Sequence, residues 1–435
     1  MQKKTSERSY KDLIITFGPA ALLLIAGFWL ASQFIAPSPP KKIVISTGSE
    51  QGSYFKVAQY YRQALAEEGI DLEILTSAGS GENIKRLLNK QVDIAFVQGG
   101  IGDNEASLMS LGSLYYEPLW LFVKKELIVE TLADITALKI SVGEEGSGTQ
   151  SLAKQLLALN HIDIASTQLL LTPTATAIKA LVEENIEGLF IVASERSDLV
   201  KELLANEQLK LINIRRADSY IKLLPFLSKV TVPEGIFSLE NNSPPEALTL
   251  LAPTVNLVVD EDFNPALMIL LLRAADKIHS KASVFAEESR FPSSELNSYP
   301  LDGVAKRFYK VGSPFLMRYL PFWPAVFIDR MMVMLVPLLM LMIPLSKIMP
   351  GLYRWRIRSR IYRWYKGLQE ITDELAEETL TAEELGYLQE KISLIDREVN
   401  KENPPLSYAD QLYNLLLHID LVRKKLDTVQ NKLSV

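Results

Sequence analysis

The feature that most constrains the fold is an alternation of strand and helix patterns over residues 42–100. Apolar runs of strand length lie at 43–45, 72–75 and 92–97, and segments with helical periodicity separate them. This order predicts a β-α-β-α-β unit, in which crossover helices join parallel strands. Open α/β sheets bind ligands beyond the carboxyl ends of their strands, where the following helices begin. The segment is therefore expected to form half of a binding cleft.

A second unit of the same kind is expected farther along the chain. Its strand patterns lie at 119–123, 139–143, 169–171 and 188–192, and its helical patterns reach Leu159 and cover 174–184. The repetition predicts two related α/β lobes, each a largely parallel sheet covered by helices. Later strands at 229–233 and 254–259 are expected to return to the first lobe, followed by a helix over 263–280.

Two apolar segments are candidates for crossing a membrane. Residues 13–35 carry no charged side chain, and a helix over them would span ~35 Å, enough for a bilayer core. A cleaved signal peptide is the competing interpretation, but Ala31-Ser32-Gln33 is a poor cleavage site and the apolar run is long for a signal core. An uncleaved anchor is favoured. A second span is expected over residues 322–346, with a buried core helix or a re-entrant segment as the alternatives.

Basic residues flank both segments, and positive flanks stay in the cytoplasm. Both termini are therefore expected on the cytoplasmic side of a bacterial inner (cell) membrane, with the ligand domain periplasmic or extracellular. The expected division is a cytoplasmic N-terminus at 1–12, a first span at 13–35, a two-lobed domain at 36–300, a linker at 301–321, a second span at 322–346 and a cytoplasmic helical tail at 347–435.

The tail reads as an antiparallel helical hairpin. Thr381 and Glu384 form a capping box, and the apolar residues after it recur at helical spacing. Asn403-Pro404-Pro405 interrupts the pattern, which then resumes from Leu412. The hairpin is expected to mediate self-association or to dock a cytoplasmic partner, and the alternative is a tail that only folds back on the basic helix at 354–366.

Three loops carry glycines and hydroxyl side chains where a strand passes into a helix. In the first, Gly48 and Gly52 allow a sharp turn, Ser53 opens the helix, and Tyr54 can close over a ligand. Each loop alone is more often structural than functional, but three at such positions favour a carboxylate or similar anion held in a cleft. The candidate ligand-binding residues are Thr47, Gly48, Gly52, Ser53, Tyr54, Gly79, Ser80, Gly81, Asn83, Gln98, Ser147, Gly148 and Thr149.

Composition argues against other classes of function. The chain has no Cys and only three His, far apart in sequence, so neither a metal nor a cofactor is expected. A net charge of -6 argues against a nucleic-acid binder. Two of the acids Glu50, Glu82 and Glu117 could in principle pair as a catalytic acid and base, but surface charge is the favoured interpretation of all three. No nucleophile elbow or zinc-protease motif is present, so an enzyme is the least favoured class.

Taken in order, these motifs resemble the TAXI family of solute receptors, which serve tripartite ATP-independent periplasmic (TRAP) transporters. The resemblance covers 41–298 and includes the run from Asp93 to Gln98 and the run from Tyr115 to Leu119. It implies a type II periplasmic binding protein fold with two lobes that close on a small organic acid or amino acid. The chain departs from the family at Ser49-Glu50, where members typically have two glycines, and in its second span and tail.

The sequence thus predicts a membrane-anchored receptor that captures a small organic anion or amino acid. Its expected partners are membrane lipid and TRAP permease subunits. The alternative is a ligand sensor that signals through its tail to a cytoplasmic partner.

Overall fold

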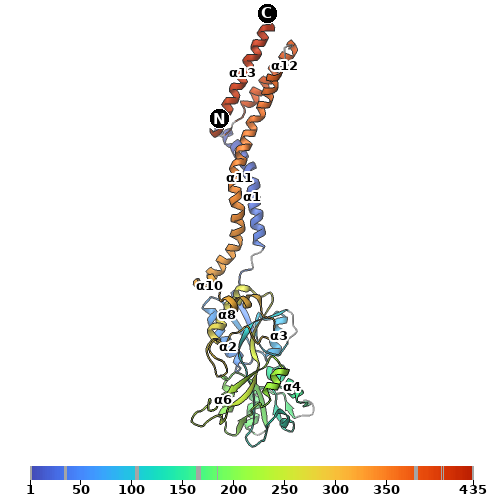
Figure 1. The fold of residues 1–435 in the computed structure, drawn as a ribbon, viewed down its shortest axis with the longest axis vertical. Helices are drawn as coiled ribbons and strands as arrows, with labels where there is room; N and C mark the ends of the chain where they lie inside the picture. Colours follow the sequence, from blue (N-terminus) through green and yellow to red (C-terminus); the bar gives the residue numbers. More distant parts are fainter. Residues whose placement is uncertain are drawn as a thin grey trace. The chain divides into compact units, whose positions relative to one another are not determined.

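The computed structural model describes residues 2–33, 37–102, 107–162, 168–183, 185–376, 381–402, 404 and 406–433 (Figure 1). The chain divides into two compact units. One contains Ala36–Phe327, and the other contains Met1–Ile35 together with Ile328–Val435.

The first lobe of the Ala36–Phe327 unit is built on a mixed sheet with the strand order β2-β1-β3-β12-β4. The strands are β1 (Lys42–Ser46), β2 (Asp71–Leu75), β3 (Ile94–Gln98), β4 (Leu108–Tyr116) and β12 (Thr254–Asp260). The helices are α2 (Ser53–Ala66), α3 (Ser80–Leu88), α8 (Pro265–His279), α9 (Gly303–Val311) and α10 (Phe315–Tyr319). β1 is parallel to β2 and β3, whereas β12 is antiparallel to β3 and β4.

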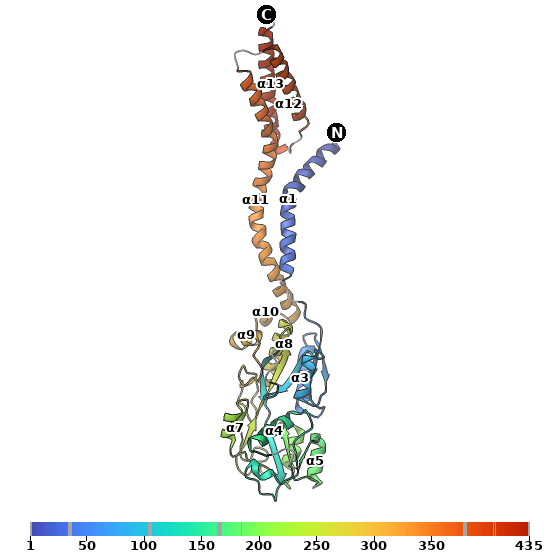
Figure 2. The ribbon, with the colours of Figure 1, turned by 90° about the vertical axis from the view of Figure 1, so that its right-hand side faces the viewer.

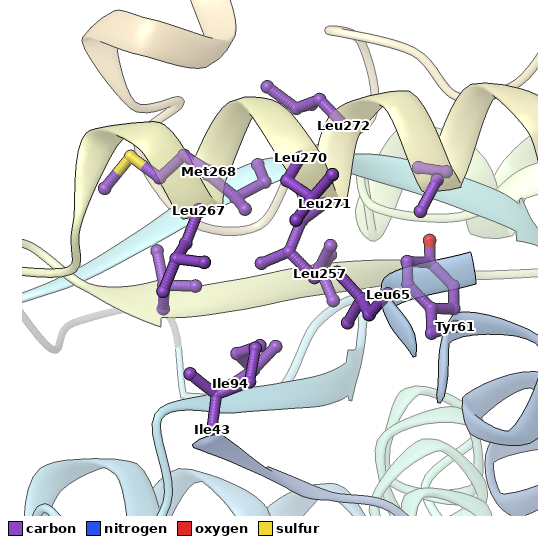
Figure 3. Close-up of a cluster of buried hydrophobic side chains, with 14 of the residues drawn as sticks. Ile43, Tyr61, Leu65, Ile94, Leu257, Leu267, Met268, Leu270, Leu271 and Leu272 are labelled. Atoms are coloured by element: carbon purple, nitrogen blue, oxygen red, sulfur yellow. The ribbon is translucent and has the colours of Figure 1, made fainter. Parts of the chain in front are cut away.

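The core of this lobe lies between the sheet and α8 and α2. α8 places Leu267 and Leu271 over Leu257 of β12 and Ile94 of β3, all fully buried (Figure 3). Tyr61 of α2 is also fully buried, and its hydroxyl points toward the α8 ribbon (Figure 3). Burying each such apolar side chain contributes about 1.5–3 kcal/mol.

The second lobe has a seven-stranded sheet in the order β10-β11-β5-β8-β6-β7, with β9 paired to β5. The strands are β5 (Leu119–Lys124), β6 (Ile140–Ser141), β7 (Leu169–Leu170), β8 (Gly188–Val192), β9 (Leu209–Leu211), β10 (Ser228–Val232) and β11 (Leu248–Ala252). The helices are α4 (Gly148–Leu159), α5 (Thr174–Val182), α6 (Asp198–Ala205) and α7 (Ala217–Leu223), with a 3-10 turn η1 (Leu132–Ile135). The described pairings of β6 with β7 and with β8 are parallel, and the others in this sheet are antiparallel. The sheet is therefore less parallel than expected.

The predicted α/β class with two lobes is confirmed, and so is the return of residues 254–259 to the first sheet as β12. The same expectation for residues 229–233 was wrong. Those residues form β10, which pairs with β11 at the edge of the second sheet, because Val230 and Val232 find their apolar partners there. β4 and β11 were not predicted.

Two short connections join the sheets. β4 continues into β5 through Glu117 and Pro118, and β11 continues into β12 through Pro253. The two connections run side by side, because the Glu117 N–H donates to the Pro253 carbonyl at 2.9 Å. We call Glu117, Pro118 and Pro253 the interlobe connections.

The second unit contains α1 (Gln2–Ser32), most of α11 (Phe322–Glu374), α12 (Ala382–Val399), the 3-10 turn η2 (Leu406–Tyr408) and α13 (Ala409–Leu433) (Figure 2). By length and composition, Ile14–Ser32 and α11 are apolar enough to cross a membrane. The apolar side chains of both are largely exposed, as Trp29 and Met340 illustrate.

The predicted hairpin of the tail is present. Thr381 and Glu384 form the expected capping box, and α12 and α13 run antiparallel, with Asp396 bound to Arg423 and Gln389 to Gln430. Asn403 and Pro405 of the predicted break lie outside the described residues. The hairpin also shares its core with α11, so the tail packs against the helix that precedes it. The core residues include Ile361, Leu368, Ile371, Leu388, Ile392 and Ile419.

Candidate functional site

The first predicted loop joins β1 to α2. Thr47 is fully buried, and its hydroxyl donates to the Leu75 carbonyl. The Gly52 N–H donates to the Ser49 carbonyl, and a side chain at Gly52 would come within 3.1 Å of that oxygen, so the turn favours glycine there. Gly48 shows no comparable constraint, because a side chain there would meet only ordinary contacts. Ser53 begins α2, as predicted.

Tyr54 is the residue of this loop whose contacts suggest a role in function. Its side chain is 8% exposed, and its hydroxyl donates to Glu117 Oε2 at 3.0 Å. Burial first, and then the neighbouring Glu117 carboxyl, raises the pKa of Tyr54. The bond joins the start of α2 to an interlobe connection.

The second loop leads into α3. Gly79 is the N-cap of α3, and Ser80 is the first helical residue. The Ser80 hydroxyl accepts the backbone N–H of Gln98 at 2.9 Å. Gly79 has φ +136, a conformation that favours glycine.

Asn83 lies inside the first lobe and is fully buried. Its amide nitrogen donates to the carbonyls of Thr47 and Phe96, and its Oδ1 accepts from Ser46 and Ser77. These four hydrogen bonds use the capacity of the amide. They favour a structural role that fixes the two loops of the first lobe.

The third loop belongs to the second lobe. Ser147 is the N-cap of α4 and accepts the Gln150 N–H. The Thr149 hydroxyl accepts the backbone N–H of Val192 at 3.0 Å. The Gly148 carbonyl accepts Gln98 Nε2 at 3.1 Å, which is a hydrogen bond between the lobes.

The second and third loops lie in direct contact. A side chain at Gly79 would come within 3.4 Å of Ser147 Cα, and one at Gly81 within 3.1 Å of the Gly146 carbonyl oxygen. At Gly148 it would come within 2.1 Å of Gln98 Oε1. Glycine at these positions lets the two lobes approach at the backbone. An exposed ion pair, Lys56 to Asp198 at 2.5 Å, joins α2 to α6 across the same boundary.

Glu117 is the main correction to the sequence interpretation of the acids. It was expected to be surface charge, but its side chain is only 4% exposed. Burial raises its pKa to about 8, and the bond from Tyr54 offsets part of that rise. A Glu between Tyr116 and Pro118 carries no sequence signal of burial, because charged residues are usually exposed.

Several buried polar side-chain atoms of the two lobes have no hydrogen-bond partner among the described residues. They include Tyr115 Oη, Tyr61 Oη, His279 Nε2 and Gln150 Nε2. The His279 ring stacks on Tyr115 with centroids 5.4 Å apart and lies 5.8 Å from Tyr61. Burial lowers the pKa of His279 to about 3, with a smaller effect from the Arg196 charge. Unpaired buried polar groups are uncommon and costly in native proteins.

Arg196 and Arg215 of the second lobe, two cations that could pair with an anion, have different surroundings. Arg215 pairs with Glu130 on the exposed surface of the second lobe and takes no part in these contacts. Arg196 lies near His279 and is paired at 3.6 Å with Glu195, whose side chain is 11% exposed. A cavity of about 460 Å³ lies elsewhere, lined by Lys125, Leu181 and Gln208 of the second lobe.

The two sheets, their paired connections and the touching glycine loops define a two-lobed α/β protein. The chain belongs to the NMT1-like family, whose sequence pattern matches residues 45–311.

Solved structures similar to this chain include binding proteins. The periplasmic aliphatic sulphonate binding protein SsuA from Escherichia coli is 14% identical, with 55% of this chain and 73% of that chain covered and a TM-score of 0.37. The alkanesulfonate-binding protein SsuA from Xanthomonas axonopodis pv. citri, bound to MOPS, is 13% identical, with 56% and 74% covered and a TM-score of 0.35. An ancestral arginine-binding protein bound to arginine is 11% identical, with 57% and 96% covered and a TM-score of 0.39.

Proposed function

We propose that residues 36–327 form an extracytoplasmic receptor domain that binds a small organic anion or amino acid between its lobes. The observation that carries the proposal is the meeting of Gly79–Gly81 with Gly146–Gly148, one loop from each lobe. Each loop opens a helix, so free backbone N–H groups of α3 and α4 lie at the boundary. A ligand that bridges the lobes would hold them in this closed arrangement. The protein acts by binding and not by covalent chemistry.

The predicted residues have two different roles in the proposed site. Tyr54 is bonded to an interlobe connection, and Gln98 and Gly148 are bonded to each other across the lobes. Ser80 accepts from the Gln98 backbone and so lies next to this contact. Thr47 and Asn83 hold the loops in shape from within the first lobe. Ligand contacts are therefore proposed for the first group and support for the second.

We further propose that Ile14–Ser32 and the apolar part of α11 anchor the domain in the bacterial inner membrane. Their exposed apolar side chains suit contact with lipid, and basic residues flank both segments. Protease added to intact spheroplasts should digest the ligand domain and spare α12 and α13. Digestion of the tail while the membrane stays sealed would refute this topology.

Transport through TRAP permease subunits, as in the TAXI family, is the proposed use of the captured solute. The second candidate is a sensor, and α11 favours it. Its first turn places Phe322 and Ala325 in the first-lobe core, and its later residues Leu368 and Ile371 lie in the tail core. Co-purification with large multispan membrane subunits would support transport, whereas a soluble partner bound through the tail would support sensing.

Ligand binding is tested by thermal unfolding of the full-length chain in detergent against organic acids and amino acids. A ligand that binds only the folded state increases the free energy of unfolding by about 2.7 kcal/mol at one hundred times its Kd, and this raises the midpoint temperature. Ser80→Ala and Gly148→Ala should reduce that shift. Absence of a shift with every acid and amino acid would contradict the proposal.

A further inference from the structure

The buried carboxyl of Glu117 has no cationic partner in the described part of the chain. Tyr54 Oη is the hydrogen-bond partner that the structure gives it, and no described Lys or Arg lies within ion-pair distance. Ionised carboxylates accept through two oxygens with about four lone-pair sites, so acceptor capacity remains. Charged side chains are almost never fully buried unless they are paired.

The surroundings of Glu117 suit a positively charged group. Tyr54 supplies a ring and a hydroxyl, and it lies 5.7 Å from the ring of Phe96. Tyr115 lies near the end of β4, and burial first, then the nearby Glu117 carboxyl, raises its pKa. It adds a second ring and a buried hydroxyl without a partner among the described residues. Aromatic faces attract ammonium groups, more strongly where water is excluded.

An anionic group is favoured next to Tyr54, because the Ser80 hydroxyl is close enough to the Tyr54 hydroxyl to offset part of the rise that burial causes in its pKa. Ser80 opens α3 and Ser147 caps α4, and both lie where the two lobes touch. The helix N-termini favour an anionic group there. Gln98 links the two helix N-termini, because its backbone N–H donates to the Ser80 hydroxyl and its Nε2 donates to the Gly148 carbonyl.

We propose that Glu117, Tyr54 and Tyr115 form an amine subsite, so that the ligand is a small zwitterion such as an amino acid and not a plain organic anion. This rests on the proposed binding function. The ligand carboxylate lies at the N-termini of α3 and α4, and its ammonium group lies on Glu117. Binding of the ammonium group leaves Glu117 ionised and paired.

The test compares ligands that differ only in the amine. The full-length chain in detergent is titrated by calorimetry near neutral pH with each standard amino acid and with the α-hydroxy acid that has the same side chain. The variants are Glu117→Gln, which keeps the shape, and Glu50→Gln, a matched control on the exposed part of the first loop. Removing one partner of a buried charge pair weakens binding by at least about thirty-fold.

We expect amino acids to bind more tightly than their hydroxy acids, and Glu117→Gln to weaken amino acids by at least about thirty-fold while changing hydroxy acids little. Glu50→Gln should leave both unchanged. Equal binding of the two series, or an amine preference that survives in Glu117→Gln, would overturn the amine subsite and leave the binding function intact. Failure of both series to bind would count against both proposals.

Discussion

Replacing Glu117 by Gln should stabilise the unliganded protein, and the gain should grow with pH. Burial raises the pKa of Glu117 from 4.5 to about 8. The folded state therefore holds a proton that the unfolded state has released between those values. Stability of the wild-type protein falls as pH rises through this window and levels off above about 8.

The magnitude follows from that pKa difference. Each pKa unit corresponds to about 1.36 kcal/mol. Compared with a side chain that never ionises, Glu117 then lowers the free energy of unfolding by about 1 kcal/mol at pH 5, about 3 kcal/mol at pH 7 and about 5 kcal/mol at pH 9. Gln has no charge to lose and its side-chain oxygen can still accept from Tyr54, so the variant should gain these amounts.

Hydrogen exchange followed by mass spectrometry measures the effect in the full-length chain. The slowest amides of β3 and β12, strands buried beside the site, report the free energy of unfolding of the domain. Comparison of variant and wild type at each pH cancels the intrinsic exchange rate. Glu50→Gln, which removes an exposed charge from the same region, is the control and should show no such trend.

A stability difference that does not change between pH 5 and pH 9, or that shrinks as pH rises, would refute the reasoning. Gained stability together with lost amine binding would mark Glu117 as a residue kept for ligand recognition at the expense of the fold.

Three further predictions address other parts of the chain. Burial lowers the pKa of His279 to about 3, so the wild-type protein loses stability as pH falls below the unfolded value of 6.5. The substitution His279→Phe should therefore stabilise the protein by about 2 kcal/mol more at pH 5 than at pH 7, as measured by the same hydrogen exchange. Leu388 is fully buried in the tail core, so Leu388→Ala should weaken protection of α12 by about 2–5 kcal/mol, while the exposed Leu394→Ala should not. Because the chain has no Cys, a short bifunctional thiol reagent should link only the two new thiols of the double variant Lys56→Cys, Asp198→Cys. Faster linking with bound ligand would indicate closure of the two lobes, whereas an unchanged rate would argue against it.

The sequence by itself determined the elements whose signal is local. The apolar runs at 43–45 and 188–192 and the helical spacing from Leu385 to Val399 correspond to buried strands and a buried helix face. Such patterns are informative because each residue's burial repeats with the period of its own strand or helix. The three glycine loops were also recognisable, since strand-to-helix turns have strong residue preferences.

Only the tertiary structure decided which distant segments meet. β12 inserts between β3 and β4 although about one hundred and fifty residues separate it from both in sequence, and β10 joins the second sheet and not the first. No local pattern encodes such pairings, because they depend on which edge remains free when the other strands have paired. The assignment of Asn83 to support, and not to the ligand, likewise required its four partners.

Glu117 shows the same division within the candidate site. Its carboxyl is buried because Tyr54, which lies 63 residues earlier, packs over the connection between the lobes. The sequence placed Tyr54 in the site through its loop but placed Glu117 on the surface through its charge. Desolvation of a single side chain depends on every segment packed around it, so only the folded chain could reveal this carboxyl as a candidate ligand contact.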